Sequence, residues 1–249
     1  MLKKILSILL VAIIISFFLI TTGCLLNRVS QFKGQLCHFD ENFAIQVQEE
    51  LHVLFFKPIL LDQDIRYLAG AEPSEKYVKD KQLIMKYVVH KTSDDSNSKY
   101  DMPIHLFLDK EEGEYKLSEC VISKNLSKLL THELISRSMK SVCKSTPHII
   151  GTNVKFKISR MERILCPTKE DLFSLFGEPK RVSKDGSVKW YEFRLVGQES
   201  KWNKAIIETH YDHSGNKLLR VKVKYLRYDF DADFVSKNAV LRVRFYKSY

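Results

Sequence analysis

The chain has 249 residues, of which 45% are hydrophobic and 28% are charged, with only 9 glycines and 6 prolines. This composition is typical of a globular protein of one or two domains, and it excludes a fibrous, collagen-like or disordered chain. The formal net charge is +10, but the basic residues alternate with apolar ones, as in segment 220–228. Because a nucleic-acid-binding arm carries a block of like charge, we expect no nucleic-acid partner.

The first 24 residues have the pattern of an export signal. Lys3 and Lys4 precede an uncharged apolar run, residues 5–20, and small residues then lead to Cys24. A basic start, an apolar centre and small residues before a cleavage point are the parts of a secretory signal peptide. The letters TTGC at the end of this segment resemble the lipobox of bacterial lipoproteins, whose cysteine receives a diacylglycerol and becomes the new N-terminus.

This resemblance implies a signal peptide at 1–23, lipidation of Cys24 and a lipid-anchored tether at 24–36. The exported body would then face the periplasm, attached to the lipid bilayer by acyl chains. Leu25 stands where an aspartate is typical of lipoproteins kept in the inner membrane, so the outer membrane is expected. The alternative is an uncleaved transmembrane anchor, because the uncharged stretch 5–26 is long enough for a bilayer that needs about 20 apolar residues.

Four further cysteines follow this leader. An even number of cysteines in an exported chain is typical of disulfides, and the sequence does not choose among the pairings. No two of them have the C-x-x-C spacing, which disfavours a zinc site and a thioredoxin-like redox site. The alternative is that all of them are buried free thiols. The candidates for disulfides are Cys37, Cys120, Cys143 and Cys166.

Segment 37–146 is predicted to form a first α+β module together with the helix that follows it. Residues 42–48 alternate between apolar and polar, and residues 51–57 are apolar and aromatic, which is the pattern of a β-hairpin. A short helix containing Asp64 follows, and Gly70 ends it. Further strands are predicted at 83–89, 102–109 and 115–122.

Segment 147–249 is predicted to form a second module, and an amphipathic helix at 123–145 joins it to the first. A strand at 154–159 leads to a helix in which Thr168 caps the N-terminus and Asp171 occupies the capping-box position. Gly177 ends this helix. Further strands are predicted at 189–195, 205–212, 217–225 and 228–234, and a last one begins near residue 238.

The two segments share one order of elements, a short helix followed by strands. Asp64 and Gly70 of the first helix correspond to Asp171 and Gly177 of the second. The sequence therefore predicts an α+β fold of two tandem small modules, each a short helix packed on an antiparallel sheet, joined by the longer amphipathic helix. The alternative is a chance likeness, because glycine and proline end many helices.

The second module resembles a known family. Segment 168–225 contains a short helix that ends in Leu-Phe-Gly-x-Pro, a strand with tryptophan and tyrosine, and a hairpin with aspartate and glycine at its turn. These features resemble the SmpA/OmlA family, which includes the BamE-like lipoproteins of the outer-membrane barrel assembly machinery. Two such modules in tandem are also similar to the secreted β-lactamase inhibitor proteins. The resemblance implies a module that binds other proteins and catalyses nothing.

The sequence contains no nucleophile, Walker or dinucleotide-binding motif. His210, Asp212 and His213 lie close together, but no further ligand has a suitable spacing for zinc, and a polar hairpin tip is the favoured interpretation. Three aspartates in segment 229–233 lack the glycine and the glutamate of a calcium-binding loop. We therefore expect no catalytic residue, no metal and no cofactor.

The expected function is that of a membrane-anchored envelope lipoprotein acting as a non-catalytic protein-binding or assembly module in the periplasm. Aromatic and basic residues, which are favoured in protein interfaces, gather in the second module. Tyr191, Arg194 and Trp202 are the candidate contacts for another envelope protein, and Trp202 stands in a polar loop. The alternative is an envelope hydrolase or a metal-binding protein.

Overall fold

The structure is a computed structural model that describes residues 27–92, 100–124, 132–144, 153–158, 168–197 and 204–244. A helix at 27–37 opens the described chain. The first half then contains α2 (Phe39–Asn42), β1 (Phe43–Val47), β2 (Leu51–Phe55), α3 (Asp62–Ala69), β3 (Glu75–Lys79), β4 (Gln82–Lys91), β5 (Met102–Glu111) and β6 (Glu114–Ile122). The second half contains α5 (His132–Lys144), β7 (Asn153–Ile158), α6 (Lys169–Phe176), β8 (Arg181–Val182), β9 (Val188–Leu195), β10 (Lys204–Tyr211), β11 (Leu218–Tyr225), β12 (Tyr228–Asp233) and β13 (Asn238–Arg244).

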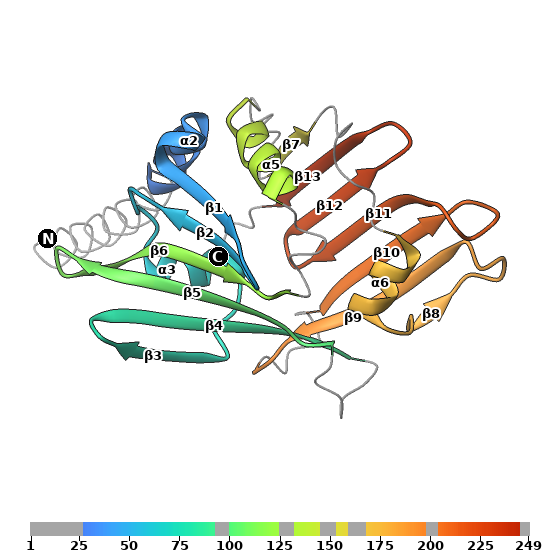
Figure 1. The fold of residues 1–249 in the computed structure, drawn as a ribbon, viewed down its shortest axis with the longest axis horizontal. Coiled ribbons are helices and arrows are strands. Elements are labelled where there is room, and N and C mark those ends of the chain that lie inside the picture. Colours follow the sequence, from blue (N-terminus) through green and yellow to red (C-terminus); the bar gives the residue numbers. More distant parts are fainter. Residues whose placement is uncertain are drawn as a thin grey trace, which may run out of the picture.

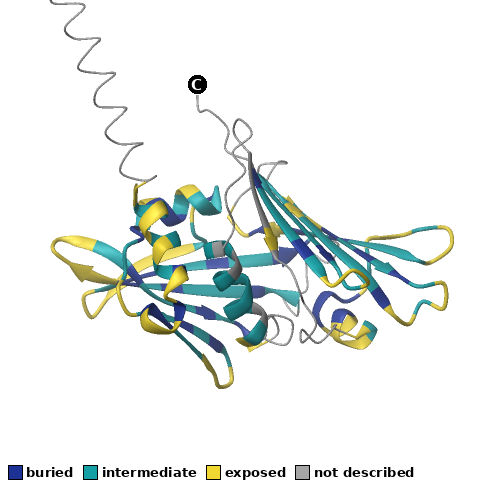
Figure 2. Ribbon diagram, turned by 90° about the horizontal axis from the view of Figure 1, so that it is seen from above, coloured by how far each residue is buried: buried dark blue, intermediate teal, exposed yellow. Residues whose placement is uncertain are grey.

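The described strands form one antiparallel sheet of 13 strands (Figure 1). Its neighbour order is β1-β2-β6-β5-β4-β9-β10-β11-β12-β13-β7, while β3 pairs with β4 and β8 pairs with β9. The two halves of the sheet meet where β4 pairs with β9 through Val89↔Leu195, His90↔Arg194 and Lys91↔Phe193. Seen from above, buried residues lie along the middle of the strands and the hairpin ends are exposed (Figure 2).

The prediction of two helix-on-sheet modules joined by a long helix is wrong. β3 covers only the first part of β4, and β8 covers only the first part of β9. The backbone groups at the other ends of β4 and β9 pair with each other, so that one sheet runs through both halves. In its described part the predicted linker helix is α5, which contacts β1 near one end of the sheet and β7 at the other. The sheet therefore bends until both of its ends approach one helix, as Figure 1 shows.

The same order of elements nevertheless occurs in both halves. α3 is followed by the strands β3 to β6, which pair in sequence, and α6 is followed by β8 to β11, which pair in the same way. The register slips by one residue between Phe107 and Leu108 on β5, and at the corresponding place on β10, between His210 and Tyr211. The equivalent strands β4 and β9 pair antiparallel to each other.

The helix ends follow the local signals in the sequence. The side chain of Thr168 accepts a hydrogen bond from the Asp171 amide (3.0 Å), and the Asp171 carboxylate accepts one from the Thr168 amide (2.9 Å), which forms the predicted capping box at α6. At α3, the Asp64 carboxylate accepts a hydrogen bond from the Leu61 amide (3.0 Å). Gly70 ends α3 in the left-handed conformation, with φ of 65°.

Replacing Gly70 with alanine is expected to lower the free energy of unfolding by more than the roughly 1–2 kcal/mol that a left-handed conformation alone costs an L-residue. The new Cβ atom would also stand only 2.6 Å from Cδ1 of Leu226, so this side chain has to move. Urea unfolding of both proteins measures the change. Gly113→Ala is the matched control, since Gly113 is also left-handed and a methyl group added there would have no atom of the described chain within 4 Å other than those of its neighbouring residues. An equal loss in both variants would contradict a close contact at Gly70.

The two largest hydrophobic cores of the described residues lie on the sheet, one under α3 and one under α6. Leu60 and Ile65 pack on β4, β5 and β6, and Leu172, Leu175 and Phe176 of α6 pack on β9, β10 and β11. The cores meet at the junction, because Leu195 of β9 belongs to the first core and Met102 of β5 to the second. Burial of these apolar side chains is the main force that holds the halves together.

The segment expected as a tether, 24–36, is helical from residue 27 and packs on the body. Leu36 is buried, and Phe32 lies with its ring 5.7 Å from the ring of Phe43. A disulfide between Cys37 and Cys143 joins the end of this helix to α5. The segment expected as a tether is therefore fixed to the folded body from residue 27 onward.

One of the predicted disulfide cysteines, Cys120, is unpaired within the described part of the chain. It packs against the first core. Burial raises the pKa of its thiol to about 12, and the nearby Glu119 carboxylate adds to this rise. The thiol is therefore protonated and unreactive near neutral pH. Cys24 and Cys166 lie outside the described residues.

Candidate functional site

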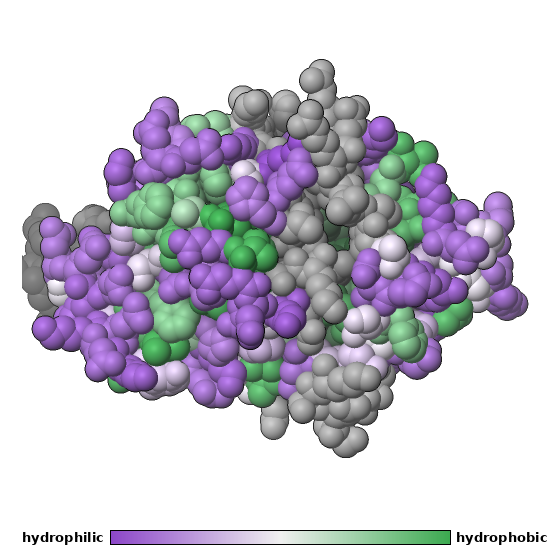
Figure 3. Space-filling view, viewed as in Figure 1, coloured by the Kyte–Doolittle hydropathy of each residue, from purple (hydrophilic) through white to green (hydrophobic). Residues whose placement is uncertain are grey.

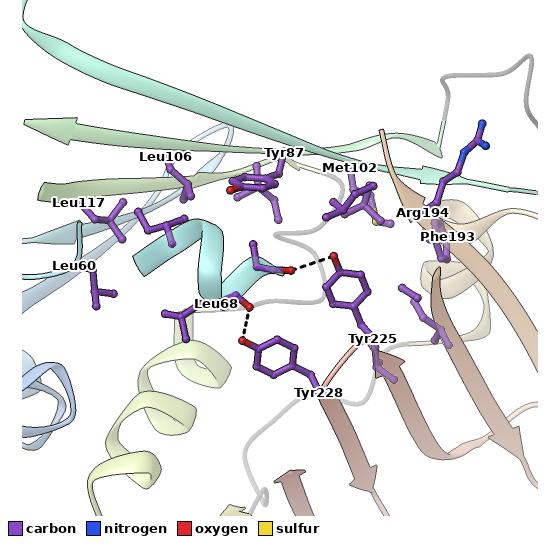
Figure 4. Close-up of a pocket in the computed structure, with 18 residues that line it drawn as sticks. Leu60, Leu68, Tyr87, Met102, Leu106, Leu117, Phe193, Arg194, Tyr225 and Tyr228 are labelled. Atoms are coloured by element: carbon purple, nitrogen blue, oxygen red, sulfur yellow. Dashed lines mark hydrogen bonds between the residues drawn. The ribbon is translucent and has the colours of Figure 1, made fainter. Parts of the chain in front are cut away.

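The strongest candidate for a functional site is a cavity between α3 and the junction of the two sheet halves (Figure 4). Its volume is about 600 Å³, and it is partly open to solvent. The first half contributes residues from α3, β4, β5 and β6, and the second half contributes residues from β9, β10, β11 and β12. Neither half forms the cavity alone, so its existence depends on the pairing of β4 with β9.

The alternation of side chains along the strands places apolar groups in the cavity. Tyr87 and Val89 of β4 lie two residues apart, as do Ala205 and Ile207 of β10. Residues two apart in a strand project on the same face of the sheet. Ile206, between the two cavity residues of β10, projects on the opposite face and is 41% exposed. In β10 the cavity residues are thus on the more buried face of the strand.

Three tyrosine hydroxyls at the cavity are already engaged. Each donates a hydrogen bond to a backbone carbonyl in or just after the last turn of α3, where helix carbonyls lack partners within the helix. The pairs are Tyr225 with Ala69 (3.2 Å), Tyr87 with Ala71 (3.3 Å) and Tyr228 with Leu68. Burial raises the pKa of all three phenols, that of Tyr225 to about 12, so they remain protonated donors near neutral pH.

The other end of α3 is held by an ion pair. The Arg28 guanidinium donates two hydrogen bonds to the Asp64 carboxylate, from Nε (2.6 Å) and Nη2 (2.7 Å). Asp64 is only 2% exposed, and a bidentate arginine–carboxylate pair is among the strongest polar contacts. Since Arg28 belongs to helix 27–37, α3 is bound at one end to that helix. At its other end it is bound to Tyr225 and Tyr228 of the second half.

The contact residues predicted from the sequence have different positions in the structure. Tyr191 is only 2% exposed, and its ring lies 5.2 Å from the ring of Phe176 in the second core. It is a core residue, and its side chain offers almost no surface to a partner. Arg194 is exposed, and Figure 4 shows its guanidinium pointing away from the cavity although the residue borders it. Trp202 lies outside the described residues.

The polar face of the second half carries paired charges. The Glu208 carboxylate accepts hydrogen bonds from Nε1 of Trp190 (3.0 Å), Nζ of Lys222 (2.9 Å) and Nε2 of His210 (2.5 Å). His210 is thus engaged within the sheet. The described residues hold no group of three or more histidine, cysteine, aspartate or glutamate side chains that could bind a metal ion.

Glu208 is expected to make stability depend on pH. Its burial alone would raise the pKa of the carboxyl, but the hydrogen bonds from Lys222, Trp190 and His210 outweigh burial and lower the pKa from 4.5 to about 2. A group whose pKa is lower in the folded state stabilises the protein above its unfolded pKa, and this contribution is lost as the pH falls from about 4.5 towards 2.

Glu208→Gln should therefore cost about 1–2 kcal/mol of unfolding free energy at neutral pH, and this difference should shrink as the pH falls through that window. Urea unfolding over a pH series measures it. Glu112→Gln is the control, because the side chain of Glu112 is 91% exposed at a hairpin tip. A Glu208→Gln cost that stays constant with pH would contradict the assignment.

The visible face of the molecule is mostly hydrophilic, with scattered hydrophobic residues (Figure 3). In the described part of the chain, no helix is long and apolar enough to cross a membrane.

Comparison with protein-family models, with curated proteins and with solved structures finds no match. The sequence alone does not predict the cavity, because alternation shows which side chains share a face and not which two strands bring their faces together.

Proposed function

We propose that this chain is a membrane-anchored, non-catalytic binding protein of the bacterial envelope that holds an apolar ligand between its two halves. The observation that carries the proposal is the cavity of about 600 Å³. Ligand sites in proteins typically measure about 300–1,000 Å³ and are mostly apolar. Water inside such a cavity finds few polar partners, whereas an apolar guest gains about 25 cal/mol per Å² that it buries.

The groups that face the cavity support binding and not catalysis. They are aliphatic and aromatic side chains, with the three tyrosine hydroxyls donated to α3. General acids and bases work best with a pKa near the working pH, and these phenols have pKa values raised well above it. We propose neither a metal nor a cofactor for this function.

The proposed anchor is the lipidated Cys24, which would place the folded body in the periplasm, on the outer membrane. Arg28 follows Cys24 after only three residues and is bound to the buried Asp64, so the body would sit close to the lipid headgroups. Cys24→Ala should release the chain into the soluble fraction or leave it unprocessed. Unchanged membrane attachment together with an unchanged mass would favour an uncleaved transmembrane anchor instead.

A cavity-filling substitution tests the ligand site. The full chain, kept soluble in an amphipathic polymer, is titrated with the uncharged fluorescent probe phenylnaphthylamine, and saturable binding is expected. Ala205→Phe places a ring in the cavity and should weaken binding about tenfold or more, whereas Ile206→Phe, on the opposite face of the same strand, should not. If the unchanged chain shows no saturable binding, the proposed function fails.

A second candidate function is the binding of another envelope protein at the polar face of the second half. The guanidinium of Arg181 in β8 lies 4.0 Å from the ring centre of Trp190 on this face. Arg194, which belongs to β9 together with Trp190, is exposed. Arginine and tryptophan are enriched in interface hot spots. Arg194→Glu should remove a partner crosslinked in intact envelopes, and an unchanged set of crosslinked proteins would overturn this candidate.

A further inference from the structure

We infer that the ligand is the hydrocarbon tail of a membrane lipid, held in the cavity with its polar head outside; this inference rests on the proposed function. The first step of the argument is the state of the polar groups at the cavity. The hydroxyls of Tyr87, Tyr225 and Tyr228 donate to carbonyls of the α3 end, and the backbone groups of the surrounding strands pair within the sheet. Arg194 directs its guanidinium away (Figure 4).

The second step concerns the chemistry that such a wall accepts. A hydroxyl or amide buried without a hydrogen-bond partner costs about 1–3 kcal/mol in proteins. A ligand with polar groups along its buried length would lose this much binding free energy at each of them, because the donors and acceptors of the wall are already occupied. A plain hydrocarbon chain has no such groups and loses none. The cavity therefore selects for a chain whose polar groups are all at one end.

The third step identifies the source of the chain. Helix 27–37 begins three residues after the proposed lipidation site, and Arg28 ties this helix to Asp64 of α3. α3 is itself one wall of the cavity, through Ile65, Leu68 and Ala69. The anchored protein would thus hold the cavity within reach of the bilayer, where acyl chains are the abundant hydrocarbon. A free fatty acid offers the same tail, so the two sources need separate experimental arms.

The first arm compares two matched acids. Bound phenylnaphthylamine is displaced from the full chain by stearic acid, or by stearic acid that carries one hydroxyl in the middle of its tail. The hydroxyl is expected to weaken displacement about tenfold, which corresponds to the cost of one unpaired polar group. Equal displacement by the two acids would overturn the hydrocarbon inference. Failure of both acids to displace a probe that does bind would also overturn it, while leaving the apolar cavity in place.

The second arm changes the wall. Tyr225→Phe removes one hydroxyl and frees the Ala69 carbonyl as an acceptor. The affinity of the hydroxylated acid should therefore rise about threefold or more relative to that of stearic acid. Tyr77→Phe is the matched control, since Tyr77 is 49% exposed on β3 and does not line the cavity. If the ratio of the affinities of the two acids is the same in Tyr225→Phe as in the unchanged chain, the role given to the tyrosine hydroxyls is contradicted.

The third arm identifies the source. The full chain is inserted into vesicles of phosphatidylethanolamine and phosphatidylglycerol that contain a phospholipid with a photoactivatable group at its tail end. Crosslinks are expected on β9 to β11, should disappear in Ala205→Phe and should persist in Ile206→Phe. Displacement by free stearic acid without crosslinks from vesicle lipid would overturn the membrane as the source. Absence of any probe binding is distinct from these results, because it removes the proposed function itself.

Discussion

Loss of the disulfide between Cys37 and Cys143 is expected to lower the free energy of unfolding by about 4–5 kcal/mol, because the bond closes a long loop in the unfolded chain. The two cysteines are 106 positions apart, and a cross-link over that distance removes much of the freedom of the unfolded state. The measurement is urea unfolding of the oxidised chain and of the variant in which both cysteines are serine. Such a loss is a large part of the stability of an ordinary domain.

The disulfide also has a local effect, because it holds the end of helix 27–37 against α5. The double serine variant should expose that helix to proteases before the sheet unfolds, whereas Cys120→Ser should not, since Cys120 is not bonded to another cysteine in the described chain. A double variant as stable as the unchanged chain would mean that Phe32, Leu36 and the Arg28–Asp64 pair hold the helix without the bond.

The parts of the fold that the sequence predicts correctly depend on neighbouring residues. The capping box of Thr168 and Asp171 needs only a four-residue segment, and the glycine that ends α3 needs only the last turn of that helix. Strands such as β4 and β9 follow from alternation and β-branched or aromatic residues. In each case the signal and the structure lie within a few positions of each other.

The parts that the sequence does not predict depend on distant pairings. Nothing near Val89 indicates that it pairs with Leu195, yet this pairing merges two predicted modules into one sheet. The short segment after Cys24 is predicted as a tether, but Phe32 and Leu36 contact apolar residues of β1 and β2, so the segment is a packed helix from residue 27 onward. Likewise, the Cys37–Cys143 pairing follows from the fold and not from the spacing.

The same reason explains the outcome at the candidate site. An aromatic residue such as Tyr191 fits equally well in a core or on a surface until the partner helix α6 is placed over it. The cavity needs the faces of two sheet halves and the last turn of α3 at once, and its walls come from segments more than a hundred residues apart. Hydrogen bonds such as Tyr225 to Ala69, across 156 positions, have no signal in the sequence.

Phe193→Ala is expected to cost about 3–5 kcal/mol of unfolding free energy, the usual range for removing a fully buried phenylalanine side chain. Phe193 has no exposed surface, its ring lies 5.5 Å from that of Phe176, and it pairs with Lys91 where the two sheet halves join. Phe173→Ala, which truncates a residue of α6 that is 50% exposed, should cost much less and is the matched control. Similar costs in both variants, measured by urea unfolding, would mean that the junction is not tightly packed.

This variant also connects stability with the proposed ligand, because Phe193 borders the cavity. The alanine removes a ring from the wall and enlarges a space that an apolar guest can fill. A ligand that binds only the folded state adds stability according to its concentration relative to the dissociation constant, about 2.7 kcal/mol at a hundredfold excess. Each variant is compared with the unchanged chain at the same concentration of stearic acid. Stearic acid should reduce the stability difference between Phe193→Ala and the unchanged chain. It should leave the smaller difference for Glu208→Gln as it is, since Glu208 lies on the polar face. Equal recovery in both variants would show that the acid stabilises the protein at a place other than the cavity.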